Sequence, residues 1–125
     1  MTKYLIVGIG GAVGSILRFW AGGYVSGRLG ARFPYGTFVI NISGCFVIGM
    51  LLTVLDGRLD LSPAWREAMA IGFVGAFTTF STFEYETLRA VQHGQAVTAL
   101  AYVLSSVVLG FGAVWAGASL GKALV

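Results

Sequence analysis

Residues 36–55 read GTFVINISGCFVIGMLLTVL, a run of 20 residues without Asp, Glu, Lys or Arg. A helix needs about 20 apolar residues to cross the hydrocarbon core of a bilayer, so this stretch predicts a transmembrane helix. The whole chain has a similar composition, because 57% of its residues are hydrophobic and 10% are charged. Such a chain lacks the polar surface of a soluble domain. The net charge of +3 comes without any basic run, so a nucleic-acid partner is not expected.

Three further segments have the same apolar character, and the sequence predicts an all-α membrane protein with four transmembrane helices. The single transmembrane domain spans residues 1–125, with helices at approximately 4–25, 36–55, 66–92 with a break near 75–79, and 95–121. The chain contains 19 glycines. In membrane helices small residues allow backbones to approach closely, and Gly10 and Gly14 have the four-residue spacing typical of such contacts.

The positive charges are balanced between the two sides of the predicted membrane domain. One side, which carries both termini, collects Lys3, Arg58, Arg66 and Lys122. The other side collects Arg18, Arg28, Arg32 and Arg89. Positive charge in cytoplasmic loops normally sets orientation, so this balance favours neither orientation. Copies inserted in opposite directions could pair, and the hypothesis is an antiparallel, dual-topology homodimer in the lipid bilayer.

Residues 72–83, GFVGAFTTFSTF, make the third segment unlike an ordinary membrane helix. The glycines and the cluster of Thr and Ser weaken helix propensity and offer competing local hydrogen bonds. Within a membrane, a broken helix is tolerated only where it is buried in protein or lines a cavity. Its freed carbonyl groups need partners, and a cation is a natural partner. The alternative is a continuous helix whose hydroxyl groups bond to the preceding turn.

Two aromatic residues and one amide are candidates for a pore. Phe80 and Phe83 are three residues apart and share a helix face. Their ring edges carry positive potential and can attract a small anion, although lipid-facing or core packing is the alternative. Asn41 lies in the middle of the second segment, and its NH₂ group can donate to an anion or form a helix–helix hydrogen bond. Tyr102 and Ser106 add a polar line to the last helix.

The Asn41 segment, Gly75 with residues 78–83, and Glu86 together resemble the Fluc family of small bacterial fluoride channels over nearly the whole chain. The resemblance implies a passive fluoride-selective channel that exports fluoride across the bacterial inner membrane and relieves fluoride toxicity. It also implies an antiparallel homodimer with two pores and a structural sodium ion at the dimer axis.

The resemblance also assigns roles to individual residues. Asn41 would be the pore amide and Phe80 and Phe83 the pore phenylalanines. Hydroxyl groups along the ion track would come from Ser81, Thr82, Tyr102 and Ser106. The backbone carbonyls of Gly75 and Thr78 would bind sodium, and Arg18 would lie near an aqueous vestibule. Two positions depart from the family pattern, Gly110 in the hydroxyl line and Glu84 within the motif.

The main alternative is a proton-coupled exporter of small ions or small cations with four helices and dual topology. Such a protein needs a carboxylate inside the membrane, whereas the first two segments contain none and Glu84 and Glu86 lie at the end of the third. Charged residues near helix ends, including Arg18 and both glutamates, usually snorkel to the interface. The alternatives are attraction of anions into a vestibule for Arg18 and a helix-capping or inter-subunit contact for Glu86. An enzyme is not expected, because no nucleophile–base pair or metal-ligand cluster occurs in the sequence.

Overall fold

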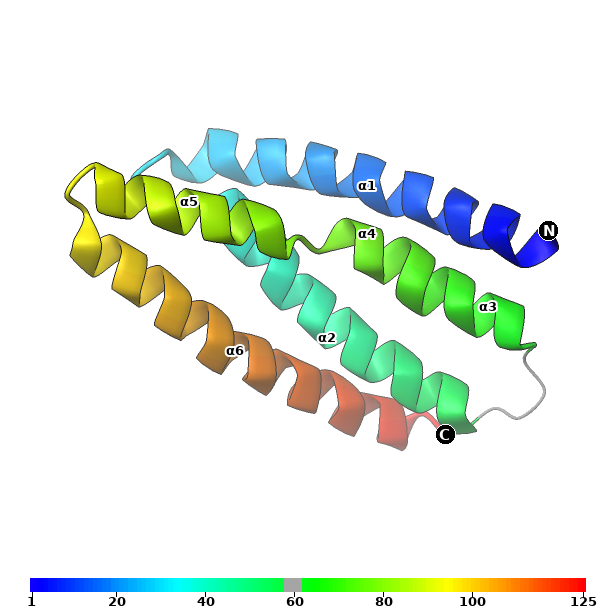
Figure 1. The fold of residues 1–125 in the computed structure, drawn as a ribbon. Coiled ribbons are helices and arrows are strands. Elements are labelled where there is room, and N and C mark those ends of the chain that lie inside the picture. Colours follow the sequence, from blue (N-terminus) through cyan, green and yellow to red (C-terminus); the bar gives the residue numbers. More distant parts are fainter. Residues whose placement is uncertain (58–61) are drawn as a thin grey trace.

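The computed structural model describes residues 1–57 and 62–125, and Arg58 of the charge balance lies outside the described residues. The described chain is all-helical, as predicted (Figure 1). Its elements are α1 (Thr2–Leu29), α2 (Tyr35–Gly57), α3 (Pro63–Glu67), η1 (Ala68–Val74), α4 (Gly75–Phe77), α5 (Phe80–Gln92) and α6 (Ala96–Ala123).

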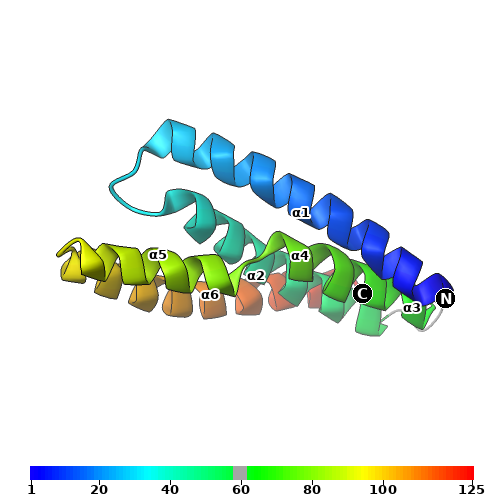
Figure 2. The same ribbon diagram turned by 45° about the horizontal axis from the view of Figure 1, so that its top comes forward.

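Three of these helices, α1, α2 and α6, are long and apolar enough to cross a membrane. The third predicted segment is divided among α3, η1, α4 and α5. These four elements follow one another along a single bent rod (Figure 1). Its first part, from α3 to α4, lies beside α1, whereas α5 diverges from α1 (Figure 2). No part of this rod is an uninterrupted helix of membrane-spanning length, because the chain leaves helical geometry at Thr78 and Thr79.

The contact between α1 and the third segment depends on glycine. A Cβ atom at Gly10 would lie 2.6 Å from the Ala68 carbonyl oxygen, and one at Gly72 would lie 2.7 Å from the Val7 oxygen. A Cβ atom at Gly14 would overlap the Phe73 carbonyl oxygen. The two backbones are therefore in direct contact. The third segment is π-helical over Ala68–Val74 at this contact, a wider geometry that is often found at functional sites.

Helices α2 and α6 pack against each other in the same manner. A Cβ atom at Gly49 would overlap the Val114 carbonyl oxygen, and one at Gly117 would overlap the Phe46 oxygen. The two helices lie side by side and converge toward the C-terminus (Figures 1 and 2). Small residues at both close contacts explain why the sequence contains so many glycines.

Large apolar side chains face outward from the bundle. Among the most exposed are Ile9, Phe19 and Trp20 on α1 and Phe111 and Trp115 on α6. Water would make this arrangement unfavourable, whereas lipid provides an apolar environment for the same side chains. The exposed apolar surface therefore agrees with the composition in indicating a membrane environment.

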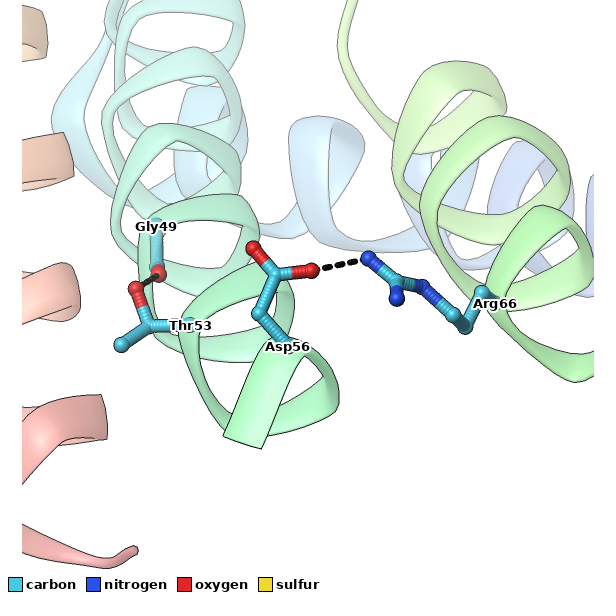
Figure 3. A network of polar contacts seen from close by, with 4 residues as sticks. All are labelled: Gly49, Thr53, Asp56 and Arg66. Carbon is cyan, nitrogen blue, oxygen red and sulfur yellow. Dashed lines mark hydrogen bonds and ion pairs between the residues drawn. The ribbon is translucent and has the colours of Figure 1, made fainter. Parts of the chain in front are cut away.

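One ion pair connects α2 to the third segment. Arg66 of α3 donates to the Asp56 carboxylate near the end of α2, while the Thr53 hydroxyl donates to the Gly49 carbonyl oxygen at 2.8 Å (Figure 3). The Asp56 and Arg66 side chains are exposed, and exposed pairs typically contribute about 1 kcal/mol or less. The pair therefore contributes little to the stability of the fold.

Candidate functional site

The third segment breaks at two threonines. Thr78 has φ −83° and ψ 159°, and Thr79 has φ −149° and ψ 110°, so both residues are extended. The Thr79 side chain then caps α5, because its Oγ1 accepts from the Thr82 backbone N–H at 3.4 Å and donates to the Thr82 hydroxyl at 2.9 Å. The Thr78 hydroxyl donates to the Val74 carbonyl oxygen at 3.1 Å. Hydroxyl bonding to the preceding turn therefore occurs together with the break.

Asn41 holds the break from the neighbouring helix α2. Its Nδ2 donates to the Thr79 carbonyl oxygen at 3.1 Å, and its Oδ1 accepts from the Thr79 backbone N–H at 2.8 Å. The amide thus satisfies both backbone groups of an extended residue, as a paired β-strand would. The helix–helix hydrogen bond considered for Asn41 is present. An amide nitrogen has two N–H groups, so one further donor remains on Asn41.

The break leaves backbone groups of opposite polarity on its two sides. In a continuous helix, the carbonyl groups of residues 75–78 would accept from the N–H groups of residues 79–82. The Thr79 and Thr82 N–H groups bond instead to the Asn41 and Thr79 side chains. The carbonyl oxygens of Gly75 and Thr78 lose their helical partners. Helix α4 therefore ends in free acceptors, whereas α5 begins with N–H donors.

A pocket of about 390 Å³ lies at the break. It brings together residues from α2, η1, α4, the break, α5 and α6. Predicted site residues among its lining are Asn41, Gly75, Thr78, Phe80, Phe83 and Ser106. The rest of the lining is mostly apolar, with Thr79 as a further polar residue. We refer to this space as the break pocket.

The two phenylalanines of the break pocket have different environments. Phe83 is 7% exposed and packs edge-on against Tyr102, with ring centroids 4.9 Å apart and planes at 68°. Phe80 is 73% exposed on the surface of the bundle. Their own ring centroids are 5.8 Å apart with planes at 43°. Phe83 is thus part of the core of the helical bundle, whereas Phe80 faces outward.

Behind Phe83, three helices contribute to a polar cluster that we call the Glu86 cluster. The Thr37 hydroxyl of α2 donates to Glu86 Oε1, and the Tyr102 hydroxyl of α6 donates to Glu86 Oε2, both at 2.8 Å. Tyr102 is 1% exposed and Thr37 is 8% exposed. The Glu86 carboxylate is half-buried, accepts from two hydroxyl donors and also lines a cavity at this end of the bundle.

Sequence reasoning did not consider Thr37 as a functional residue. A signal was available, because Thr37 and Asn41 are four residues apart and lie on the same face of α2. Phe83 and Glu86 are three residues apart on α5 in the same way. Each pair connects the break pocket to the Glu86 cluster along one helix.

The remaining predicted site residues lie outside the lining of the break pocket. Ser81 and Thr82 occupy the exposed first turn of α5, and the Thr82 hydroxyl contacts Thr79. Tyr102 lies behind Phe83 with its hydroxyl bonded to Glu86. Arg18 is partly exposed on α1 and lines neither the break pocket nor the other pockets described.

The departures from the family pattern also have clear positions. Gly110 is buried on α6, and a Cβ atom there would lie 3.5 Å from the Cys45 sulfur, an ordinary contact distance. The space at Gly110 therefore does not require glycine. Glu84 is exposed on α5.

Comparison with known proteins gives one family and several close relatives. The family described as "CrcB-like protein, Camphor Resistance (CrcB)" matches residues 5–118. A protein of Acidobacterium capsulatum is 60% identical over 123 residues, 98% of each chain. One of Solibacter usitatus is 51% identical over 120 residues, 96% of this chain and 98% of its own. One of Rhizobium meliloti is 40% identical over 125 residues, the full length of both. Each is named "Fluoride-specific ion channel FluC".

Proposed function

Because the chain belongs to the CrcB-like family, and relatives over nearly its full length are named fluoride-specific ion channels, we propose that it is a fluoride-specific ion channel. It is a multi-pass membrane protein of a channel family, not an enzyme. Conduction would be passive and would release fluoride from the cell, which relieves fluoride toxicity. The observation that carries this proposal is the helix break held by Asn41 beside Phe80 and Phe83 in a bundle of membrane-spanning helices.

The break pocket supplies the chemistry that a dehydrated fluoride ion needs. Fluoride binds water strongly, so a pore must replace that water with closely placed donors. The second N–H of Asn41 and the Ser106 hydroxyl belong to side chains that line the pocket. Phe80 and Phe83 add positive ring edges without a full charge, and weak binding allows an ion to leave as well as enter. Hydroxyl groups of Ser81, Thr82 and Tyr102 would extend this track.

A structural sodium ion would bind at the carbonyl side of the break. The Gly75 and Thr78 carbonyl oxygens have lost their helical partners, and both residues line the break pocket. Hard cations prefer such oxygen ligands. The described residues contain no group of three or more His, Cys, Asp or Glu side chains that could hold a metal ion, so the carbonyl groups are the fitting donor set. The ion would add positive charge near the anion path.

An antiparallel homodimer would complete the site. Phe80 faces outward at the break, and its 73% exposure leaves the ring available to a second copy. Two carbonyl groups are too few to surround a sodium ion, whereas a symmetry-related copy would supply two more. The balance of positive charge between the two sides supports insertion in both orientations. Each dimer would then contain two pores.

Proton-coupled export is the second candidate, and Glu86 is the observation that favours it. A coupled exporter needs a carboxylate within its helical bundle, and Glu86 bonds to Thr37 and Tyr102 there. In this alternative Glu86 would bind and release the transported proton. The two candidates differ in whether fluoride moves without a proton gradient.

Efflux from liposomes tests both candidates. Purified protein is reconstituted into vesicles loaded with fluoride or chloride, and a fluoride or chloride electrode records ion loss without a proton gradient. Fast loss of fluoride with retention of chloride is the expected result. Fluoride loss that requires an imposed proton gradient would support coupled export. If neither condition releases fluoride, both candidates fail.

A further inference from the structure

The last turns of α1 carry two aromatic rings and an arginine on one face of the helix. Trp20, Tyr24 and Arg28 follow one another at four-residue spacing, which places them on the same face. The Trp20 and Tyr24 rings stack with centroids 5.9 Å apart and planes at 18°. The Arg28 guanidinium group lies over the Tyr24 ring, 5.2 Å from its centroid. All three side chains are exposed, and we refer to them as the Arg28 face.

The protein surface beside the Arg28 face is hollowed. A cavity of about 490 Å³ is lined by Phe19, Trp20, Gly22, Gly23, Tyr24 and Ser26. Gly23 and Gly27 continue the line of Phe19 at four-residue spacing, and a Cβ atom at either glycine would have nothing within 4 Å. An open strip without side chains therefore runs along α1 beside the stacked rings and reaches the level of Arg28.

The Arg28 face points away from the other helices. Helix α1 lies along one edge of the bundle in both views (Figures 1 and 2). Trp20 is 65% exposed and Tyr24 is 55% exposed, whereas the buried residue of α1 is Gly14. Since α1 is long and apolar enough to cross a membrane, lipid is the neighbour that this face would meet.

Arg28 has a charge that no carboxylate neutralises. In residues 1–57 and 62–125 the one ion pair joins Arg66 to Asp56. Arg28 lies in the last turn of α1. Trp and Tyr side chains concentrate at the membrane–water interface, so Trp20 and Tyr24 place the guanidinium group at the level of the lipid headgroups.

We propose that the Arg28 face binds an anionic phospholipid, with the lipid phosphate at the Arg28 guanidinium group and an acyl chain along Gly23 and Gly27. A guanidinium group can pair with a phosphate through two parallel hydrogen bonds. The Tyr24 hydroxyl and the Trp20 indole N–H are donors for the ester region of the same lipid. A zwitterionic lipid would bring its own ammonium group close to Arg28. The site should therefore prefer a headgroup of net negative charge.

One unpaired arginine should give a modest but measurable preference. A single Lys or Arg near an anionic membrane surface changes affinity by about 5-fold. We therefore expect the Arg28 face to bind phosphatidylglycerol about 5-fold more tightly than phosphatidylcholine. Salt screens exposed charges, so this preference should decrease as the ionic strength rises.

The test uses Trp20 as a local probe. Trp65→Phe/Trp115→Phe leaves Trp20 as the only tryptophan, and both replaced rings are exposed. This parent protein is reconstituted into phosphatidylcholine vesicles in which brominated phosphatidylglycerol or brominated phosphatidylcholine replaces part of the lipid. Bromine quenches a tryptophan that the lipid contacts, so the quenching curves give the relative affinity of the two lipids at Trp20.

Three variants of the parent protein separate a site from general surface charge. Arg28→Gln should remove the preference for phosphatidylglycerol, and Arg28→Lys should keep part of it. Arg32→Gln is the matched control, because it removes the same charge from the α1–α2 connection, outside the Arg28 face. This control should keep most of the preference.

A second measurement avoids the tryptophan replacements. Native mass spectrometry of the unmodified chain and of Arg28→Gln, in micelles with both lipids, should show bound phosphatidylglycerol on the unmodified chain and much less on the variant. Equal binding of the two lipids, or an equal loss of preference in Arg28→Gln and Arg32→Gln, would overturn the proposal. Absence of quenching by either lipid would also overturn it, because protein would then cover Trp20.

Discussion

Replacement of Asn41 by leucine should disable the helix break while nearly preserving side-chain volume. The substitution removes the donor to the Thr79 carbonyl oxygen and the acceptor for the Thr79 N–H. A buried group left without its hydrogen bond costs about 1–3 kcal/mol. Two such groups in one residue give a loss of about 2–6 kcal/mol. Relaxation of the chain into a continuous helix would recover part of this energy but would destroy the carbonyl arrangement at the break.

Asn41→Asp tests the sign of the charge that the site accepts. Aspartate keeps an acceptor for the Thr79 N–H, but its second oxygen would face the Thr79 carbonyl oxygen in place of the amide donor. Repulsion between these two acceptors and the cost of burying a charge add to the loss of one hydrogen bond. The negative charge of the aspartate would also lie in the anion path. We therefore expect fluoride efflux to be nearly abolished in both variants, with a loss of stability in each.

The assays are SDS-induced unfolding in mixed micelles and fluoride efflux from liposomes. Ser43→Ala is the matched control on the same helix, because the Ser43 hydroxyl donates only to the Ile40 carbonyl oxygen of its own turn at 3.0 Å. This control should stay within about 0.5 kcal/mol of wild type. If Asn41→Leu kept both the unfolding free energy and the efflux rate of wild type, Asn41 would neither hold the break nor serve the pore.

Phe80→Ile and Phe83→Ile should each reduce fluoride efflux strongly, because the ring quadrupole is lost. Only Phe83→Ile should lower the free energy of unfolding, since Phe83 is buried and Phe80 is exposed. Normal efflux in both variants would rule out attraction by ring edges. Replacement of sodium by a large organic cation throughout purification should weaken dimer formation measured by light scattering, whereas an unchanged dimer would argue against the axial ion. Gly14→Ala should destabilise the fold by about 1–3 kcal/mol, because its Cβ would overlap the Phe73 carbonyl oxygen; Gly23→Ala, which has nothing within 4 Å, is the matched control for SDS unfolding.

The helix break could be predicted from local sequence because its causes are local. Glycine and hydroxyl residues lower helix propensity wherever they occur, and the Thr79 cap involves Thr82, only three residues away. The side chain that bonds to the break from another helix could not be predicted from local sequence. Asn41 is 38 residues from Thr79 in the sequence, and only the packing of α2 against the third segment brings them together.

The hydrogen-bond partners of Glu86 could not be predicted for a similar reason. Snorkelling assumes that water is the nearest source of hydrogen-bond donors for a charged group near a helix end. Here the nearest donors are the hydroxyls of Thr37 and Tyr102, 49 and 16 residues away in the sequence. Residue types and spacing on one helix do not show which donors another helix will supply.

The close contact of α1 with the third segment has a consequence for sequence variation. Helix α1 has Gly14 as its buried residue, while its large apolar side chains point away from the bundle. Backbone atoms at Gly10 and Gly14 make the contact that side chains make in most proteins. A complete substitution scan should therefore find most of α1 freely exchangeable among apolar residues, with intolerance confined to a narrow line of positions that includes 10 and 14. In this helix, the positions that must lack a side chain define the contact with the third segment.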